Sequence, residues 1–368
     1  MKLDKNGKII WEKDYGFPGE SNMAHNMFHL SNGNLLLRVN NFDSPQSIFR
    51  FLEVDKNGEI NWQKQINVTS DVFFGIDAKY YERNMFLLSA FYKSNYFTFS
   101  KHNENLEKAW EKTFSFQDVG SIIQTIRYTQ SAQNYYFVVG LKHNDVDYII
   151  VLKTGLDGNI IYQKSFLGVF PNLIQDIFIT DEDHVVLTIG GAGYSEVLSL
   201  DSSGSFVSGK KLSASGLLYV GKVEKDNDGK HLINTVSWAE GRPNHIRLYV
   251  DNSLDLYQEK GFISDPENKY NNYYRGFYQT NDDHYLIAGE VYSFDTEYYR
   301  QSVWLLKESI INSYTKTEDF TVMFTNSVLE EVSFDLVLAT NSDNVAVETN
   351  TNILSVSESS ITKTLFIR

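Results

Sequence analysis

A turn motif of the form Asp-x-x-Gly, followed by Trp or Tyr and then by a lysine, recurs along the chain. Residues 3–13 and 54–64 are nearly identical copies, and residues 156–164 form a third close copy. Asp and Asn side chains bond to nearby backbone groups, and Gly adopts a positive φ at little steric cost. An Asp-Lys-Asn-Gly stretch between apolar runs therefore predicts a β-hairpin. Repetition of this hairpin constrains the fold more than any other feature of the sequence.

The repeat has a period of about 50 residues, and two series of markers show it. The first consists of the lysines that close successive copies: Lys13, Lys64, Lys112, Lys164, Lys210, Lys260 and Lys316. The second, half a period away, consists of polar turn residues that lead into apolar strands: Asn34, Asn84, Asn134, His184, His231, His284 and Asn344. Each period holds about four short strands, which is typical of a propeller blade. We therefore expect an all-β, seven-bladed β-propeller with four antiparallel strands per blade.

The marker series also predict where the blades begin and end within a single domain. The expected blades are residues 14–64, 65–112, 113–164, 165–210, 211–260, 261–316, and 317–368 completed by 1–13. Residues 362–368 read like a third strand of the repeat, and residues 8–13 read like a fourth. We expect the N-terminal strand to close the last blade, because such closure leaves the ring without an open edge.

Composition and the distribution of apolar residues disfavour several kinds of partner and site. The formal net charge of −14 disfavours a nucleic-acid partner, since DNA and RNA backbones are polyanions. No run of about 18 apolar residues occurs, so we expect no membrane insertion. The chain has no cysteine, and therefore no disulfide or thiolate site. No signal peptide precedes the first expected strand.

The pattern Leu-Asp-x-x-Gly-x-x-x-Trp-x-Lys resembles a repeat of bacterial surface and secreted β-propellers. It is similar, more loosely, to the quinoprotein-like repeat with its outer-strand Trp. The resemblance covers the whole chain and is sharpest at residues 3–13, 54–64 and 156–164. It implies a binding or scaffolding role at a cell surface or outside the cell, rather than one defined activity. Quinoprotein chemistry requires acidic metal ligands and cofactor-stacking residues that the sequence does not identify, so we expect no cofactor.

Three histidines and one acidic turn are candidate metal ligands. His184, His231 and His284 occupy the same turn position in successive repeats, which would suit a ring of ligands. Asn stands there in the other repeats, and His tolerates turn conformations much as Asn does, so we interpret these histidines as structural. The stretch 226–229, Asp-Asn-Asp-Gly, resembles part of a calcium loop but lacks the spacing and the closing Glu. We expect no metal site.

Aromatic residues in the expected outer strands have two interpretations. They could form a platform for glycans, or they could pack between neighbouring blades, and packing is the interpretation that we favour. The residues in question are Trp11, Trp62, Trp110, Tyr162 and Tyr314.

The loops that vary most between repeats are rich in aromatic residues and arginine, the composition of a recognition surface. They cover residues 15–22, 42–46, 238–244, 264–274 and 292–300. Their aromatic side chains could also simply fill crevices between long loops. The predicted contact face consists of Trp238, Arg242, Tyr270, Tyr273, Tyr274, Tyr298 and Tyr299.

Two functional hypotheses follow. The first is a non-catalytic binding or structural propeller that presents a loop-rich face to a protein or glycan, within an assembly at a cell surface, in a phage or in a secretion machine. The alternative is a carbohydrate-active enzyme, a glycoside hydrolase or lyase, with carboxylates in the axial channel. No Gly-x-Ser-x-Gly elbow or phosphate-binding loop is present, and no catalytic residue is assigned.

Overall fold

The structure is a computed structural model of the 368-residue chain. It describes the following residues: 2–4, 9–11, 13, 15, 22–41, 47–68, 73–91, 95–116, 121–167, 174–191, 194–213, 217–225, 231–239, 242–251, 254, 256–263, 271–279, 284–293, 300–309, 323–326, 331–332 and 336–339. The chain divides into two compact units, composed mainly of residues 1–124 and 125–334.

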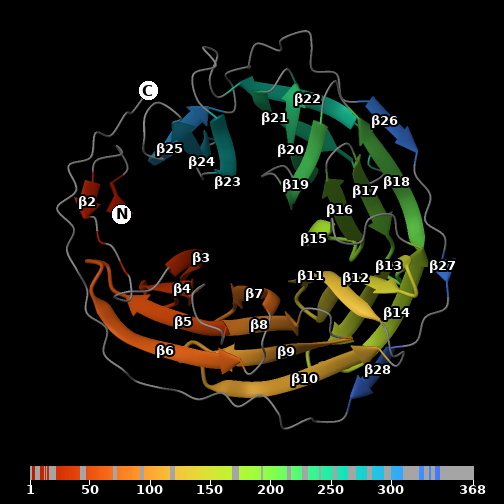
Figure 1. Ribbon diagram of the computed structural model, residues 1–368, viewed down its shortest axis with the longest axis horizontal. Coiled ribbons are helices and arrows are strands. Elements are labelled where there is room, and N and C mark those ends of the chain that lie inside the picture. The colour runs from red at the N-terminus through yellow and green to blue at the C-terminus, as the bar shows by residue number, and fades with distance from the viewer. Residues whose placement is uncertain are drawn as a thin grey trace. The chain divides into compact units, whose positions relative to one another are not determined.

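The first unit contains two antiparallel four-stranded sheets and a short hairpin (Figure 1). The hairpin pairs β1 (Lys2–Leu3) with β2 (Ile9–Trp11). The first sheet has the order β3 (Asn22–His29), β4 (Leu35–Asn41), β5 (Ser47–Val54) and β6 (Ile60–Val68). The second has the order β7 (Phe73–Tyr81), β8 (Asn84–Phe91), β9 (Tyr96–Asn103) and β10 (Lys108–Phe116), and β28 (Leu336–Ala339) pairs with β10 as a fifth strand.

The second unit continues the same pattern in four sheets. The first consists of β11 (Ile122–Gln130), β12 (Asn134–His143), β13 (Val146–Gly155), β14 (Ile160–Leu167) and a fifth strand, β27 (Glu331–Val332). The next consists of β15 (Ile174–Ile179), β16 (Val185–Gly191), β17 (Tyr194–Leu200), β18 (Phe206–Ser213) and a fifth strand, β26 (Met323–Asn326). Then follow β19 (Leu217–Lys225), β20 (His231–Ala239), β21 (Arg242–Val250) and β22 (Leu256–Ile263). The described part of the last sheet has β23 (Asn271–Gln279), β24 (His284–Ser293) and β25 (Arg300–Ser309).

Apart from the added strands β26, β27 and β28, each described sheet is a meander in which consecutive strands pair with one another, as expected for propeller blades. The predicted all-β class and the antiparallel four-stranded sheets are therefore confirmed. The number of seven blades, their boundaries and the closure by the N-terminal strand stay predictions. The expected closing strand, residues 8–13, contains β2, which pairs with β1, and its expected partner at residues 362–368 lies outside the described residues.

The hydrophobic core lies where successive sheets face each other. Leu36 and Phe51 of the first sheet pack with Met85 and Leu87 of the second, and Phe51 is fully buried. In the second unit, strand β12 is buried from Tyr135 through Leu141, on both of its faces. A strand covered on both faces loses the alternation of polar and apolar residues, which explains the continuous apolar runs of the second strands. Replacing a buried Phe by Ala would cost about 3–5 kcal/mol.

Candidate functional site

The repeated Asp-x-x-Gly turn is built by its own aspartate. Asp55 Oδ1 accepts hydrogen bonds from the backbone N–H of Asn57 at 2.8 Å and of Glu59 at 2.9 Å. Gly58 closes the turn with a bond to Asp55 O at 3.0 Å and takes φ +80°. The hydrogen bond from Glu59, followed by that from Asn57, holds the pKa of Asp55 below its ordinary value. The carboxylate is thus stabilised in its charged form by the turn that it organises.

The aromatic residue and the lysine of one repeat contact the turn of the next repeat. Trp11 Nε1 donates to Lys56 O at 2.8 Å, and Tyr15 Oη donates to Gly58 O at 2.7 Å. Lys13 forms an ion pair with Glu59.

The same relation recurs further along the chain. Lys64 lies 5.4 Å from the centroid of the Trp62 ring and donates a hydrogen bond to Asn105 O. A Cβ placed on Gly204 would lie 2.5 Å from the Tyr162 ring. The preferred interpretation of these aromatic residues, packing between repeats, is confirmed for Trp11 and Tyr162. Trp110 packs edge-on against Phe99 of its own sheet.

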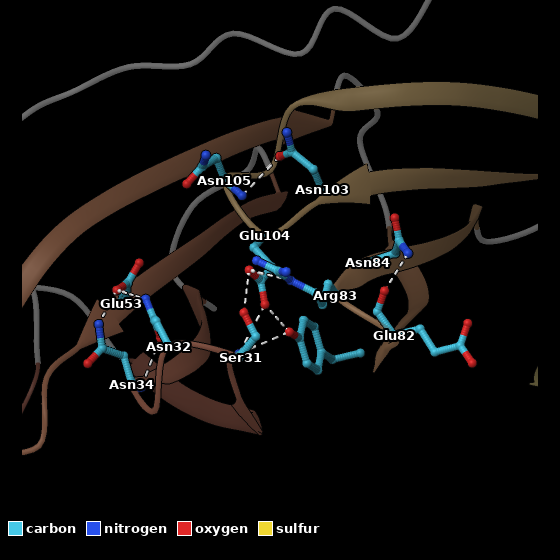
Figure 2. A network of polar contacts seen from close by, with 11 residues as sticks. Ser31, Asn32, Asn34, Glu53, Glu82, Arg83, Asn84, Asn103, Glu104 and Asn105 are labelled. Atoms are coloured by element: carbon cyan, nitrogen blue, oxygen red, sulfur yellow. Dashed lines mark hydrogen bonds and ion pairs between the residues drawn. The ribbon is translucent and has the colours of Figure 1, made fainter.

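A second contact between neighbouring sheets is centred on Glu104, in the turn between β9 and β10 (Figure 2). Its carboxylate accepts bonds from Ser31 N at 3.0 Å, from Ser31 Oγ at 2.9 Å and from Tyr80 Oη. Arg83 Nε lies 3.6 Å from Glu104 Oε2. Burial opposes ionisation of Glu104, but the bonds from Tyr80 and Ser31 and the charge of Arg83 outweigh it, so its pKa is lowered. Ser31 belongs to the first sheet, so this network joins the turns of two sheets.

Beside this network lies Glu53, a buried carboxylate on β5. Its Oε1 accepts amide hydrogens from Asn32 at 3.1 Å, from Asn61 at 3.1 Å and from Asn34. A buried carboxylate is tolerated only when hydrogen bonds replace its hydration, and three amides meet that need here. Glu53 therefore serves to hold the Asn32–Asn34 turn against its sheet.

In the second unit the equivalent position carries a buried lysine. Lys153 Nζ donates to Asp183 Oδ2 at 2.6 Å and lies 5.2 and 5.8 Å from the ring centroids of Tyr136 and Tyr162. Tyr136 Oη also donates to Asp183, and burial together with that carboxylate raises the pKa of Tyr136. Asp183 stands in the turn of the next sheet with φ +65°. As with Glu104, a carboxylate at a turn joins two successive sheets.

The structure places each of the three candidate histidines at the entry to the second strand of its sheet. His231 is buried at the start of β20, edge-on to the Phe178 ring, and the backbone N–H of His184 bonds to Thr180 Oγ1. His284 begins β24. Among the residues that the structure describes, no three or more His, Cys, Asp or Glu side chains are grouped as metal ligands would be. The calcium-like stretch 226–229 lies outside the described residues.

The predicted contact face falls at the ends of strands. Trp238 pairs with Pro243, and Ala239 with Arg242, across the turn between β20 and β21. Tyr273 and Tyr274 are the third and fourth residues of β23, so they belong to a strand rather than to a loop. Tyr270, Tyr298 and Tyr299 lie outside the described residues.

The described part of the chain contains no helix with the length and apolar character needed to cross a membrane.

Sequence reasoning missed the carboxylate and lysine contacts between sheets. A partial signal exists: Glu53, Lys101 and Lys153 are charged residues at matching positions of the third strands of successive repeats. Each of the first two pairs with a buried apolar residue of the second strand, Leu36 and Phe86 respectively. A charge at such a position predicts a polar partner, but not which sheet supplies it: the amides that bond to Glu53 belong to its own sheet, whereas Asp183, which bonds to Lys153, belongs to the next sheet.

The chain matches no protein-family model and no curated protein sequence. Solved structures with a similar fold include hydrazine synthase of Kuenenia stuttgartiensis, with TM-score 0.46 and 11% identity, covering 76% of this chain and 78% of that one. The WD40 domain of SCAP from fission yeast has TM-score 0.37 and 12% identity, covering 78% and 74%. The NanB sialidase of Streptococcus pneumoniae has TM-score 0.37 and 12% identity, covering 85% and 62%. The chain spans 36% of a bifunctional GH43-CE protein of Bacteroides eggerthii, with TM-score 0.37 and 13% identity. At these TM-scores and sequence identities, the similarity to the solved structures indicates neither a function nor a functional site for this chain.

Proposed function

We propose that the protein is a non-catalytic binding or structural protein that presents one end of its sheets to a protein or glycan partner. The observation that carries the proposal is the placement of Trp238, Arg242, Tyr273 and Tyr274 at corresponding strand ends of two adjoining sheets. Trp238 and Arg242 flank the turn from a second to a third strand, and Tyr273 and Tyr274 lie near the beginning of a first strand. In an antiparallel meander these positions share one end of the sheet.

The two sheets that carry these residues adjoin each other within the second unit, where β21 lies against β23. In the sequence, Tyr270 directly precedes β23, and Tyr298 and Tyr299 directly precede β25. Trp, Tyr and Arg are the residues most enriched among those that dominate binding energy. Their concentration at one end of adjoining sheets supports a contact face there.

The carboxylates described at the other end of the sheets support a structural role for that end. Glu104 and Asp183 accept hydrogen bonds from donors of the adjacent sheet, and Asp55 accepts hydrogen bonds from its own turn. The environments of Asp55, Glu104 and Asp201 lower their pKa values. A glycosidase general acid needs the opposite shift, because it must hold a proton near neutral pH.

A panel of immobilised glycans, followed by affinity capture of proteins from the source organism, would provide a purified partner for the test. The double variant Trp238→Ala, Tyr274→Ala should then bind at least about tenfold more weakly, a loss of about 1.4 kcal/mol. Tyr81→Ala is the matched control, because Tyr81 is an exposed aromatic residue at the other end of its sheet. Circular dichroism melts should show all variants folded.

Unchanged affinity of the double variant would show that the contact face is wrongly placed. Turnover of aryl glycosides or of a fluorogenic sialoside by the unmodified protein would overturn the non-catalytic role itself. In that case the carbohydrate-active alternative would replace it.

A further inference from the structure

Three short strands from residues 323–339 add to the outermost strands of three sheets. In the first unit, β28 pairs with the last four residues of β10. In the second unit, β27 pairs with Ser165 and Phe166 of β14, and β26 pairs with the last four residues of β18. All three pairings are antiparallel, and all lie near the C-terminal end of the outer strand (Figure 1).

The sheets do not require this fifth strand. In the described part of the chain, the β3–β6 and β19–β22 sheets have four strands each, and their outer strands β6 and β22 are as long as β10 and β18. A fifth strand is therefore a segment docked onto a complete sheet. An exposed strand edge presents unpaired N–H and C=O groups, which is what an added strand needs.

The docked segment and the outer strands have complementary chemistry. Residues 323–326 and 336–339 are Met-Phe-Thr-Asn and Leu-Val-Leu-Ala, which include the strand-favouring Phe324, Thr325 and Val337. In the sequence, the acidic residues Glu330, Glu331 and Asp335 come between them. The outer strands carry the basic residues Lys108, Lys112, Lys164, Lys210 and Lys211. A docked strand that carries Glu331, on outer strands that carry lysines, combines backbone pairing with charge attraction.

We propose that the outer edges of β10, β14 and β18 are strand-addition sites that also accept the strands β28, β27 and β26 of a second copy of this chain. The pairings span only four, two and four residues, so each opens at small cost. The segment of the same chain has the advantage of an effective concentration in the millimolar range. Exchange between copies should consequently rise with protein concentration. This self-association is independent of the contact face at Trp238 and Arg242.

Site-specific cross-linking can test the proposal, because the chain has no cysteine of its own. Lys211 is exposed and pairs with Thr325. Protein carrying Lys211→Cys is mixed with protein carrying Thr325→Cys, incubated over a series of concentrations up to the millimolar range, and oxidised. Directly opposed side chains lie on the same face of the sheet, close enough for a disulfide. We expect a covalent mixed dimer whose yield increases with concentration.

The control replaces Thr325→Cys by Asn326→Cys, because Asn326 pairs with Lys210 and is therefore one residue out of register with Lys211. The mixed dimer from the in-register pair should exceed that from the control at least about fivefold. Melts by circular dichroism establish that each variant is folded. An in-register yield equal to that of the control overturns the proposal, and so does cross-linking that occurs only within single chains carrying both Lys211→Cys and Thr325→Cys.

Discussion

The indole Nε1 of Trp11 donates a hydrogen bond to the backbone carbonyl of Lys56 at 2.8 Å, although the two residues are 45 positions apart in the chain. Lys56 lies in the Asp-x-x-Gly turn of the first sheet, and Trp11 belongs to the preceding copy of the same motif. The aromatic residue of one repeat thus forms a hydrogen bond with the turn of the next repeat. This relation explains why the turn and the aromatic residue recur together in the sequence.

The substitution Trp11→Phe keeps an aromatic ring but removes the indole donor. We expect the free energy of unfolding to fall by about 1 kcal/mol, the usual net value of one hydrogen bond. Urea denaturation followed by circular dichroism would measure it. Trp11→Ala should cost more, because it also removes the ring. Equal stability of Trp11→Phe and the unmodified protein would show that the bond contributes nothing to folding.

Gly33 and Gly204 have the same backbone conformation, so substituting each by Ala separates the cost of backbone strain from the cost of a steric clash. Gly33 has φ +83° with nothing within 4 Å of an added Cβ, whereas Gly204 has φ +82° and its Cβ would meet the Tyr162 ring at 2.5 Å. Gly33→Ala should cost about 1–2 kcal/mol from the left-handed backbone alone. Gly204→Ala should cost about 1–3 kcal/mol more, because the ring must move. Denaturant titrations of both variants give the difference, and equal losses would exclude contact between Tyr162 and the turn.

Buried His102 should make stability depend on pH. Its Nδ1 donates to Leu106 O at 3.2 Å, so Nε2 is unprotonated and accepts from Ser100 Oγ at 2.9 Å. Burial lowers its pKa to about 4, against the opposing effect of the bond to Leu106 and with a smaller contribution from Lys108. Between pH 6.5 and pH 4 the His102 imidazole is therefore protonated in the unfolded chain but neutral in the folded chain. Stability should be full above about pH 6.5 and fall by roughly 3 kcal/mol towards pH 4.

Chemical denaturation at several pH values would measure this loss. The matched variant His102→Gln cannot titrate, so its stability should decline less between pH 6.5 and 4 than that of the unmodified protein. Parallel pH curves for the two proteins would exclude His102 as the cause.

Closure of the last blade predicts that the two ends of the chain depend on each other. Removing residues 1–13 and removing residues 362–368 should each lower the melting temperature, by on the order of 2–4 °C per kcal/mol lost. If both segments belong to one sheet, removing both should cost little more than removing one, because the second deletion has no partner left to lose. Melting curves of the three truncated proteins test this. Losses that simply add would contradict the closure.

Much of the fold could be predicted from local chemistry. Asp55, Asn57 and Gly58 form their turn through contacts within a few residues, so the hairpin is visible in the sequence. The packing of Trp11 and Tyr162 followed from their recurrence next to that turn. The partners of Glu104 and Lys153 could not be found in this way. Ser31 lies 73 residues from Glu104 and Asp183 lies 30 residues from Lys153, and nothing in the sequence alone brings such residues together.

The sequence by itself determined the strand-rich class, the four-strand repeat and the turn chemistry, because each depends on residues that are neighbours in the chain or recur at a fixed period. Only the tertiary structure decided that Lys153 and Asp183 meet between two sheets and that β26, β27 and β28 lie on outer strand edges. These contacts join segments that are far apart in the sequence. Their free energies depend on the neighbouring sheet against which the charged side chain or the added strand packs.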